Sequence, residues 1–108
     1  MPLYLKLINL LKREYPLIHQ IPKVYKFSLG QDIINKNWVL IDLFIVAQST
    51  GNCEKRKIVE KINSEFDSLK LRIRFLSELN LISLNQAAAI SQDIVEIGKM
   101  IGSWLKNV

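Results

Sequence analysis

The sequence has little of what covalent or metal chemistry needs. Its 108 residues include one cysteine, Cys53, and one histidine, His19. A lone cysteine forms no internal disulfide, and so few Cys and His residues do not make a zinc site. Glycine-rich phosphate-binding loops and nucleophile elbows are absent as well. We therefore predict a protein that is not an enzyme, with no catalytic residues, no cofactor, no metal ion and no small-molecule substrate.

Proline, glycine and long apolar runs are also scarce. Three prolines and four glycines against 49% hydrophobic residues indicate a folded domain with a real core. The length predicts a single domain over residues 1–108. The longest apolar run, residues 38–47, is interrupted by Asp42 and is about half as long as a bilayer-spanning helix. No cleavage site for a signal peptide follows the apolar N-terminus. We expect a cytoplasmic protein with no membrane partner.

Helix start signals occur at two serines. Ser28 and Ser83 each stand three residues before a glutamine, Gln31 and Gln86, which is the spacing of a capping box. In this motif the serine side chain accepts from an amide of the first turn, and the glutamine side chain bonds back to the cap. Helices are therefore expected to begin near residues 29 and 84.

Proline and glycine mark the remaining helix borders. The first helix should run from Pro2 to about residue 20, with a kink or break at Pro16, and the following Ile-Pro dipeptide should end it. Gly51 supplies a helix C-terminus and Asn52 a new cap, so one helix should end near residue 50 and the next begin near 53. Residues 54–80 contain no Pro or Gly, and no period-2 run of β-branched residues occurs anywhere. The pattern predicts an all-α four-helix bundle with up-down topology and short loops.

Two of these helices have more apolar surface than one core can cover. The third helix carries a core-facing stripe at helical spacing, formed by Ile58, Ile62, Phe66, Leu69, Ile73 and Leu76. A second stripe, Leu71, Phe75 and Leu79, lies more than about 100° around the same helix. The second helix is apolar on every side over residues 38–47, apart from Asp42. Because a monomer of this size has no element left to cover these faces, we predict assembly into a closed ring or barrel.

The last helix carries glycines in its interior, where each costs about 1 kcal/mol relative to alanine. Gly98 and Gly102 share a face with Ala87, Ser91 and Val95, which makes a groove of mostly small residues that a neighbouring helix can enter. Such a groove serves packing or assembly. The residues predicted at the oligomer interface are Trp38, Leu71, Phe75, Leu79, Gly98, Gly102 and Trp104.

The formal net charge is +5, and the positive charge is concentrated in residues 1–26 and 54–74. A localised basic surface favours nucleic acid or an acidic partner. An ordinary solvated helix face, with pairs such as Arg56/Glu60 and Lys61/Glu65, would carry similar charges. The candidate binding residues are Arg56, Lys57, Lys61, Lys70, Arg72 and Arg74 on the third helix, and Lys12, Arg13, Lys23 and Lys26 near the N-terminus.

Two further features could indicate chemistry. Arg13 and His19 loosely fit the R-x4-6-H signature of HEPN-type ribonucleases, but in that family the pair lies on one helix near the C-terminus. The alternative is a surface arginine and a partly buried histidine near a helix end. Asp42 has no His, Cys or second acid three or four residues away, so we interpret it as a hydrogen-bonding residue at the interface or beside a Lys or Arg.

Several segments, in order along most of the chain, resemble the accessory variability determinant (Avd) family of diversity-generating retroelements. The last is the most specific, because it places Gly98, Lys99, Gly102 and Trp104 on one helix in the pattern G-[KR]-x-[IL]-G-x-W. The four-helix-bundle proteins encoded in intervening sequences of ribosomal RNA genes are related and share the entry to the second helix at residues 27–30. The matching segments are residues 15–23, 43–47, 71–76 and 97–105.

The resemblance implies a function as well as a fold. It implies a basic four-helix bundle that assembles into a homopentamer and binds the reverse transcriptase of the retroelement together with its template RNA. The reverse transcriptase performs the mutagenic copying, and the accessory protein is not the catalyst. The alternative is a stand-alone RNA- or protein-binding bundle of the intervening-sequence type, and a HEPN-like ribonuclease is the third possibility.

Overall fold

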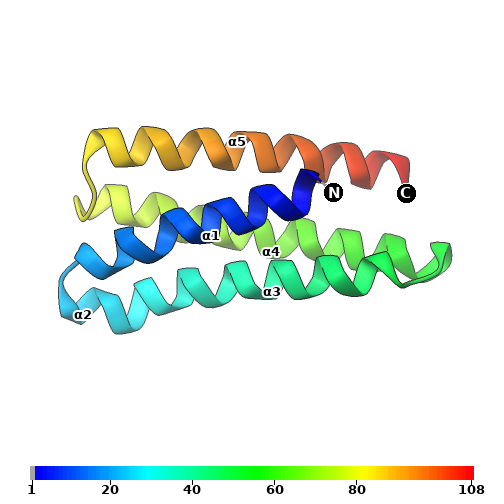
Figure 1. The fold of residues 1–108 in the computed structure, drawn as a ribbon, viewed down its shortest axis with the longest axis horizontal. Coiled ribbons are helices and arrows are strands. Elements are labelled where there is room, and N and C mark those ends of the chain that lie inside the picture. Colours follow the sequence, from blue (N-terminus) through cyan, green and yellow to red (C-terminus); the bar gives the residue numbers. More distant parts are fainter. Residues whose placement is uncertain (1) are drawn as a thin grey trace.

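The computed structural model describes residues 2–108, and within them the chain is an all-α bundle of four long helices. Successive long helices run in opposite directions along the longest axis of a body measuring 44 × 23 × 19 Å (Figure 1). The prediction of an all-α four-helix bundle is confirmed. The elements are α1 (Pro2–Gln20), α2 (Lys23–Tyr25), the π-helical turn η1 (Lys26–Gly30), α3 (Gln31–Gln48), α4 (Asn52–Glu78) and α5 (Leu84–Asn107).

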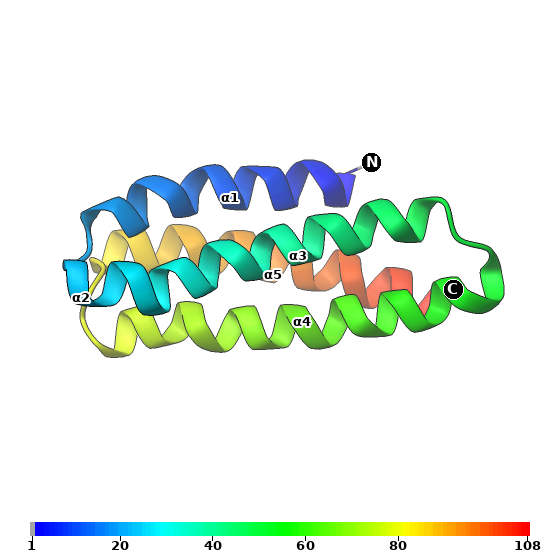
Figure 2. The ribbon, with the colours of Figure 1, turned by 90° about the horizontal axis from the view of Figure 1, so that it is seen from below.

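The four long helices lie at the corners of a square. α1 contacts α3 and α5, and α4 contacts the same two helices from the other side. Figure 2 shows α1 and α4 on opposite sides of the bundle, with the α3–α4 connection reaching beyond the N-terminus of α1. None of the helices described is both long and apolar enough to cross a membrane.

The core contains the stripe predicted on the third helix, with one shift. Ile62, Phe66 and Leu69 are buried, as are Ile73 and Leu76 farther along α4. At the start of the stripe Val59 is the fully buried residue, and Ile58 is only partly buried. The helix therefore enters the core one residue later than the spacing predicted.

The first helix continues through Pro16 from Pro2 to Gln20 without a break. Proline removes one backbone donor, but Pro16 is exposed, so the freed carbonyl four residues earlier can be solvated. The Ile-Pro dipeptide ends the helix as predicted, and Pro22 then accepts backbone bonds from Tyr25 and Lys26 to start the next turn.

The capping prediction is correct at Ser83 and wrong at Ser28. Ser83 accepts from the Gln86 amide at 3.1 Å, and the Gln86 side chain accepts from the Ser83 amide at 2.8 Å. Ser28 instead lies inside η1, and its hydroxyl donates to the Val24 carbonyl at 2.9 Å. The reason is that Pro22 already starts the helix, so Ser28 is an interior residue.

The start of α4 differs from the expectation, and its end is set by a residue that was not predicted from the sequence. Gly51, with an extended backbone, occupies the N-cap of α4, and Asn52 is the first helical residue and not the cap. The end of α4 is set by Asn80, whose φ of 58° is the left-handed conformation that terminates helices. The Leu81 amide donates to the Leu76 carbonyl at 2.9 Å, which completes a Schellman motif.

The closest approach at a glycine is at Gly30 and not in the last helix. A Cβ at Gly30 would lie 2.6 Å from Cγ2 of Ile18, whereas one at Gly98 would make an ordinary 3.5 Å contact with Phe66. A Cβ at Gly102 would meet nothing within 4 Å. Within this chain, the predicted close packing of a helix on Gly98 and Gly102 does not occur.

Candidate nucleic-acid and partner interface

Three of the candidate cations on α4, Lys57, Lys61 and Arg72, share one face of the helix, and Arg72 is paired with an acid of α3. Arg72 lies beside Asp32 of α3, with Nε 3.5 Å from the carboxylate, and its guanidinium also donates to the Ser68 carbonyl at 3.1 Å. Glu65 pairs with Lys36 of α3 at 2.8 Å, so the expected Lys61/Glu65 pair does not form. Arg72 therefore connects α4 to α3 through a partly exposed ion pair, and a phosphate would have to compete with Asp32 for it.

The other three candidate cations on α4, Arg56, Lys70 and Arg74, share the face toward α5, and two of them have partners within the chain. Lys70 pairs with Asp67 at 3.0 Å and lies over the Phe66 ring, 5.3 Å from its centroid. Arg56 donates to the Val108 carbonyl at 3.0 Å, and the expected pair with Glu60 is absent from residues 2–108. The Lys70 pair is exposed and is worth little, so Lys70 remains accessible to an external anion.

Three cations of α4 are exposed and have no hydrogen-bond or ion-pair partner in the described chain. They are Lys57 and Lys61 toward the start of the helix and Arg74 near its end. Arg74 also lines a groove of about 300 Å³ between α4 and α5, whose floor includes Ile73 and Ile90. An exposed cation without a partner gives up no internal ion pair when it binds phosphate, so these three are the strongest candidates on this helix.

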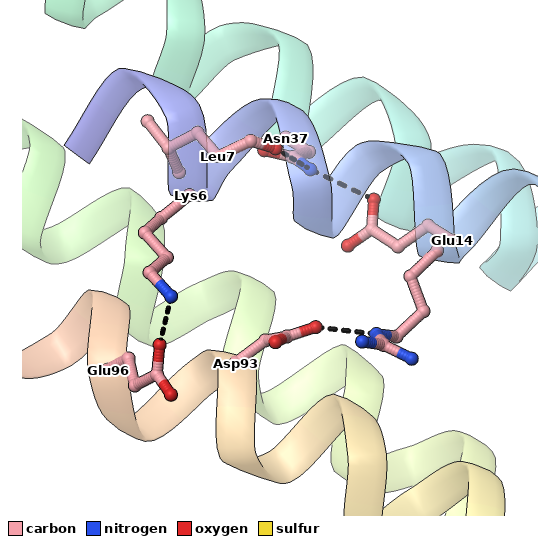
Figure 3. Close-up of polar contacts among 7 residues, drawn as sticks. Lys6, Leu7, Glu14, Asn37, Asp93 and Glu96 are labelled. Carbon is pink, nitrogen blue, oxygen red and sulfur yellow. Dashed lines mark hydrogen bonds and ion pairs between the residues drawn. The ribbon is translucent and has the colours of Figure 1, made fainter. Parts of the chain in front are cut away.

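The cations near the N-terminus, which we call the N-terminal cluster, also include some that are paired with acids and some that are not. Arg13 donates to Asp93 of α5 at 2.6 Å. Lys6, about two turns earlier, pairs with Glu96 of α5, and this hydrogen bond raises the pKa of Lys6 (Figure 3). Lys12 and Lys23 are exposed and Lys26 is half-buried, and none of the three has an acidic partner within residues 2–108.

The structure adds two cations that the sequence reasoning missed. Lys106 of α5 and Lys55 of α4 belong to the end of the bundle where Arg56 contacts Val108. An open hollow of about 390 Å³ lies there, lined by Lys55, Asn52, Trp104, Asn107 and Val108. Antiparallel packing brings the last residues of α5 beside the first turns of α4. The up-down topology predicted from the sequence already implies that the end of the last helix lies beside the start of the third, and this could have identified Lys55 and Lys106 as neighbours.

Two apolar surfaces remain uncovered. On α3, Trp38 is 42% exposed, and Val39, Ile45 and Val46 are exposed with it. On α4, Leu71 and Phe75 are 60% and 48% exposed, next to exposed Phe27 of η1. A hollow of about 630 Å³ between η1 and α4 is lined by Tyr25, Phe27, Leu29, Phe75 and Leu79, together with polar Ser28, Gln31 and Asp32.

The other residues predicted at the oligomer interface have contacts inside the bundle. Trp104 packs edge-on against Phe44, with ring centroids 5.6 Å apart, and Gly98 faces Phe66. Leu79 is partly buried, while Gly102 lies on the open surface of α5. Trp38, Leu71, Phe75 and Gly102 are thus the members of that group with the most surface left for a partner.

A buried polar pair lies between α1 and α3, and the sequence reasoning did not find it. Glu14 is fully buried and accepts from the Asn37 side-chain amide at 3.1 Å, and the same amide donates to the Leu7 carbonyl at 3.3 Å (Figure 3). One oxygen of each side chain, Oε2 of Glu14 and Oδ1 of Asn37, has no hydrogen-bond partner. Burial raises the pKa of Glu14 to about 8, and the Asn37 hydrogen bond opposes part of that shift.

The remaining candidates for chemistry do not come together. Arg13 extends to Asp93 on α5, whereas His19, six residues later, lies about 120° away around the helix and is exposed rather than partly buried. Asp42 is exposed in the apolar surface of α3, with no ion-pair partner among residues 2–108. No group of three or more His, Cys, Asp or Glu residues in the described chain is placed to hold a metal ion.

Comparison with known families agrees with this basic helical bundle. A family model described as bAvd-like matches residues 3–108, nearly the whole chain. The chain belongs to the bAvd-like family. No curated protein is similar enough to the chain to count as a match. Membership of an Avd-like family indicates an accessory role in diversity-generating retroelements.

Proposed function

We propose that this bAvd-like protein is a non-catalytic accessory that binds the reverse transcriptase of a diversity-generating retroelement and its template RNA during mutagenic retrohoming. The observation that carries the proposal is the family match over residues 3–108. The exposed cations without acidic partners, Lys57, Lys61 and Arg74 on α4 and Lys12 and Lys23 near the N-terminus, support the nucleic-acid part.

The proposed RNA contacts are electrostatic. Lysines act as point charges toward phosphate, whereas Arg74 can hold a phosphate with two parallel hydrogen bonds. Because the contacts are to the backbone of the nucleic acid, binding should depend strongly on salt and weakly on sequence.

We propose that the protein acts as a homo-oligomer, a closed ring and specifically a pentamer. The two uncovered apolar surfaces support assembly, because Trp38 on α3 and Phe75 on α4 lie on different helices and give each copy two unlike faces. Unlike faces produce head-to-tail contacts, which close into a ring when the rotation between copies allows it. A ring would also repeat the free cations and strengthen RNA binding by multivalency.

The nucleic-acid proposal is tested with the double variant Lys57→Glu/Lys61→Glu and template RNA carrying a fluorescent label. Binding is measured by anisotropy across a salt series. We expect the slope of log affinity against log salt to fall by about one for each lysine that contacts phosphate. The double variant Lys12→Glu/Lys23→Glu changes the net charge equally and tests the free cations near the N-terminus as the competing site.

The two double variants give distinct outcomes. A larger loss in the α4 variant supports the α4 site, and a larger loss in the Lys12/Lys23 variant moves the site to the N-terminal cluster. Equal losses show that both groups of cations contact the RNA. If neither variant changes the slope, the protein does not bind RNA through these cations and this part of the proposal is wrong. Arg72→Glu would set a second carboxylate against Asp32 and disturb the α3–α4 contact, so a loss of binding in that variant would not identify an RNA contact.

The reverse transcriptase and the assembly are tested separately. For the partner, we expect a reverse transcriptase gene near this gene and co-purification of its product with this protein. Failure of co-purification, together with the absence of template and variable repeats near the gene, would favour the stand-alone RNA- or protein-binding bundle. Light scattering of the purified protein tests the assembly. A monomer at micromolar concentration contradicts the proposed homo-oligomer.

A further inference from the structure

Two hydrogen bonds join α1 to α3 at the same level, one inside the bundle and one on its surface. Inside, Asn37 donates to Glu14 at 3.1 Å. Outside, the indole nitrogen of Trp38 donates to the Tyr15 hydroxyl, also at 3.1 Å. The two bonds are made by consecutive residues on both helices. Any change in the spacing of α1 and α3 at this level must act on both.

The inner bond is sensitive to the charge of Glu14. The carboxyl is fully buried, and its Oε2 has no donor. A protonated carboxyl leaves no uncompensated charge there, and its O–H can donate to an acceptor such as the unpartnered Oδ1 of Asn37. An ionised carboxyl places a full charge in the core with one amide as its partner, which is the costly state.

The side chains of the outer hydrogen bond, Tyr15 and Trp38, have little packing around them. Tyr15 and Trp38 are 50% and 42% exposed, so their rings have solvent on one side. Each polar group of this aromatic pair has the other as its partner. The position of the Trp38 ring therefore reports on the distance between the two helices, and it is the largest side chain of the uncovered α3 surface.

The cations next to Glu14 and Asn37 in the sequence are paired with other acids and do not neutralise the Glu14 carboxylate. On α1, Arg13 is directed to Asp93 of α5, and on α3, Lys36 is directed to Glu65 of α4. Lys12, Tyr15 and His19 of α1 are exposed to solvent, as is Asp42 of α3, one turn from Trp38. None of the charged groups in the described chain forms an ion pair with Glu14.

We propose that the Glu14–Asn37 pair is a proton-dependent brace that fixes the exposed Tyr15–Trp38 pair, so that loss of the Glu14 proton loosens this part of the α1–α3 surface. The brace acts locally, at the level where the two bonds coincide, and the ends of the helices keep their packing. The inference concerns this surface alone and does not rest on the proposed RNA or reverse transcriptase partners. Burial raises the pKa of Glu14 to about 8, which places the change at mildly alkaline pH.

The experiment follows Trp38 emission and its quenching by acrylamide between pH 6 and pH 9. The background carries Trp104→Phe, so that Trp38 is the single tryptophan, and His19→Gln, which removes the imidazole near Tyr15. In this background we expect the emission to shift to longer wavelength and quenching to rise, with a midpoint near pH 8. Far-ultraviolet circular dichroism and light scattering, recorded on the same samples, should stay constant, which shows that neither helicity nor self-association through the Trp38 surface causes the shift.

Glu14→Gln should abolish the pH-dependent shift, because the amide keeps the shape of the side chain and cannot ionise. Asp42→Asn is the matched control: it removes a carboxylate one turn from Trp38 on the surface and should leave the midpoint unchanged. Emission that does not change with pH in the Glu14 parent overturns the proposal without any need for the Glu14 variant to fold. A shift that occurs only together with loss of helicity also overturns it, because Glu14 would then act on global stability alone.

Discussion

Gly30 lies so close to Ile18 that a Cβ at Gly30 would come within 2.6 Å of the Ile18 Cγ2. Ile18 is branched at Cβ, so this methyl group cannot swing away without moving the side chain as a whole. The Tyr25 carbonyl, 3.4 Å from the same position, limits movement on the other side. The entry to α3 is therefore packed against the end of α1 through the missing side chain of Gly30.

Gly30→Ala should lower the free energy of unfolding by about 1–3 kcal/mol, the usual cost of overpacking. Gly102→Ala is the control, because its Cβ meets nothing within 4 Å and alanine favours the helix by about 1 kcal/mol. Urea unfolding of both variants checks the prediction. An unchanged midpoint for Gly30→Ala would show that the α1–α3 contact adjusts easily.

Glu14 should make the stability of the bundle fall as the pH rises. Its pKa is about 8 in the folded protein against 4.5 as the ordinary value, so the folded state binds the proton more tightly. The stabilising contribution of the proton is complete below about pH 4.5 and is lost as the pH rises to about 8, a difference on the order of several kcal/mol. Glu14→Gln should unfold at a urea concentration that changes much less across this range. If the urea midpoints of the parent and of Glu14→Gln changed with pH to the same extent, the buried Glu14 carboxyl would not be the cause of the pH dependence.

Ser83→Ala should destabilise the protein by about 1 kcal/mol, because it removes the side-chain acceptor of the α5 capping box. Ser28→Ala should change stability by less than about 0.5 kcal/mol, since the Ser28 hydroxyl donates to carbonyls of its own helix and caps nothing. Thermal unfolding measured by circular dichroism distinguishes the two. Equal losses at both serines would mean that Ser28 does act as a cap.

Phe75→Glu should reduce self-association while leaving the fold intact. Phe75 is 48% exposed on α4, so a carboxylate there is solvated in the monomer and buried only when another copy covers this face. Light scattering measures the change, and circular dichroism confirms the helix content. Leu69→Glu, at a fully buried position of the same helix, is expected to unfold the protein instead. An oligomer of unchanged size in the Phe75 variant would show that this surface is not part of the interface.

The helices and most of the core could be predicted from the sequence because apolar spacing is a local pattern. Residues on one face of a helix recur at three or four positions, so Ile62, Phe66 and Leu69 could be assigned to the core before any partner was known. The Ser83 box is equally local. The apolar stripe and the capping box can each be recognised from residues that lie close together in the sequence.

The features that sequence reasoning missed depend on contacts between distant segments. Glu14 reads as an ordinary surface acid until Asn37, 23 residues later, is placed opposite it. The same is true of the cations, because Arg72 and Asp32 belong to different helices. A candidate site made of surface charges can be proposed from the sequence, but which charges are free is decided by packing.

The π-helical turn at Lys26–Gly30 gives the chain one place where its length can change at low cost. A π-turn holds one residue more than the α-helical turn it replaces. Deleting one residue there would leave an ordinary α-helix, and the faces that α3 presents to α1 and α4 would keep their direction. A deletion within α3 itself would rotate everything after it by about 100° and bring polar side chains into the core. Among related sequences, this turn is where single-residue gaps are expected to be tolerated.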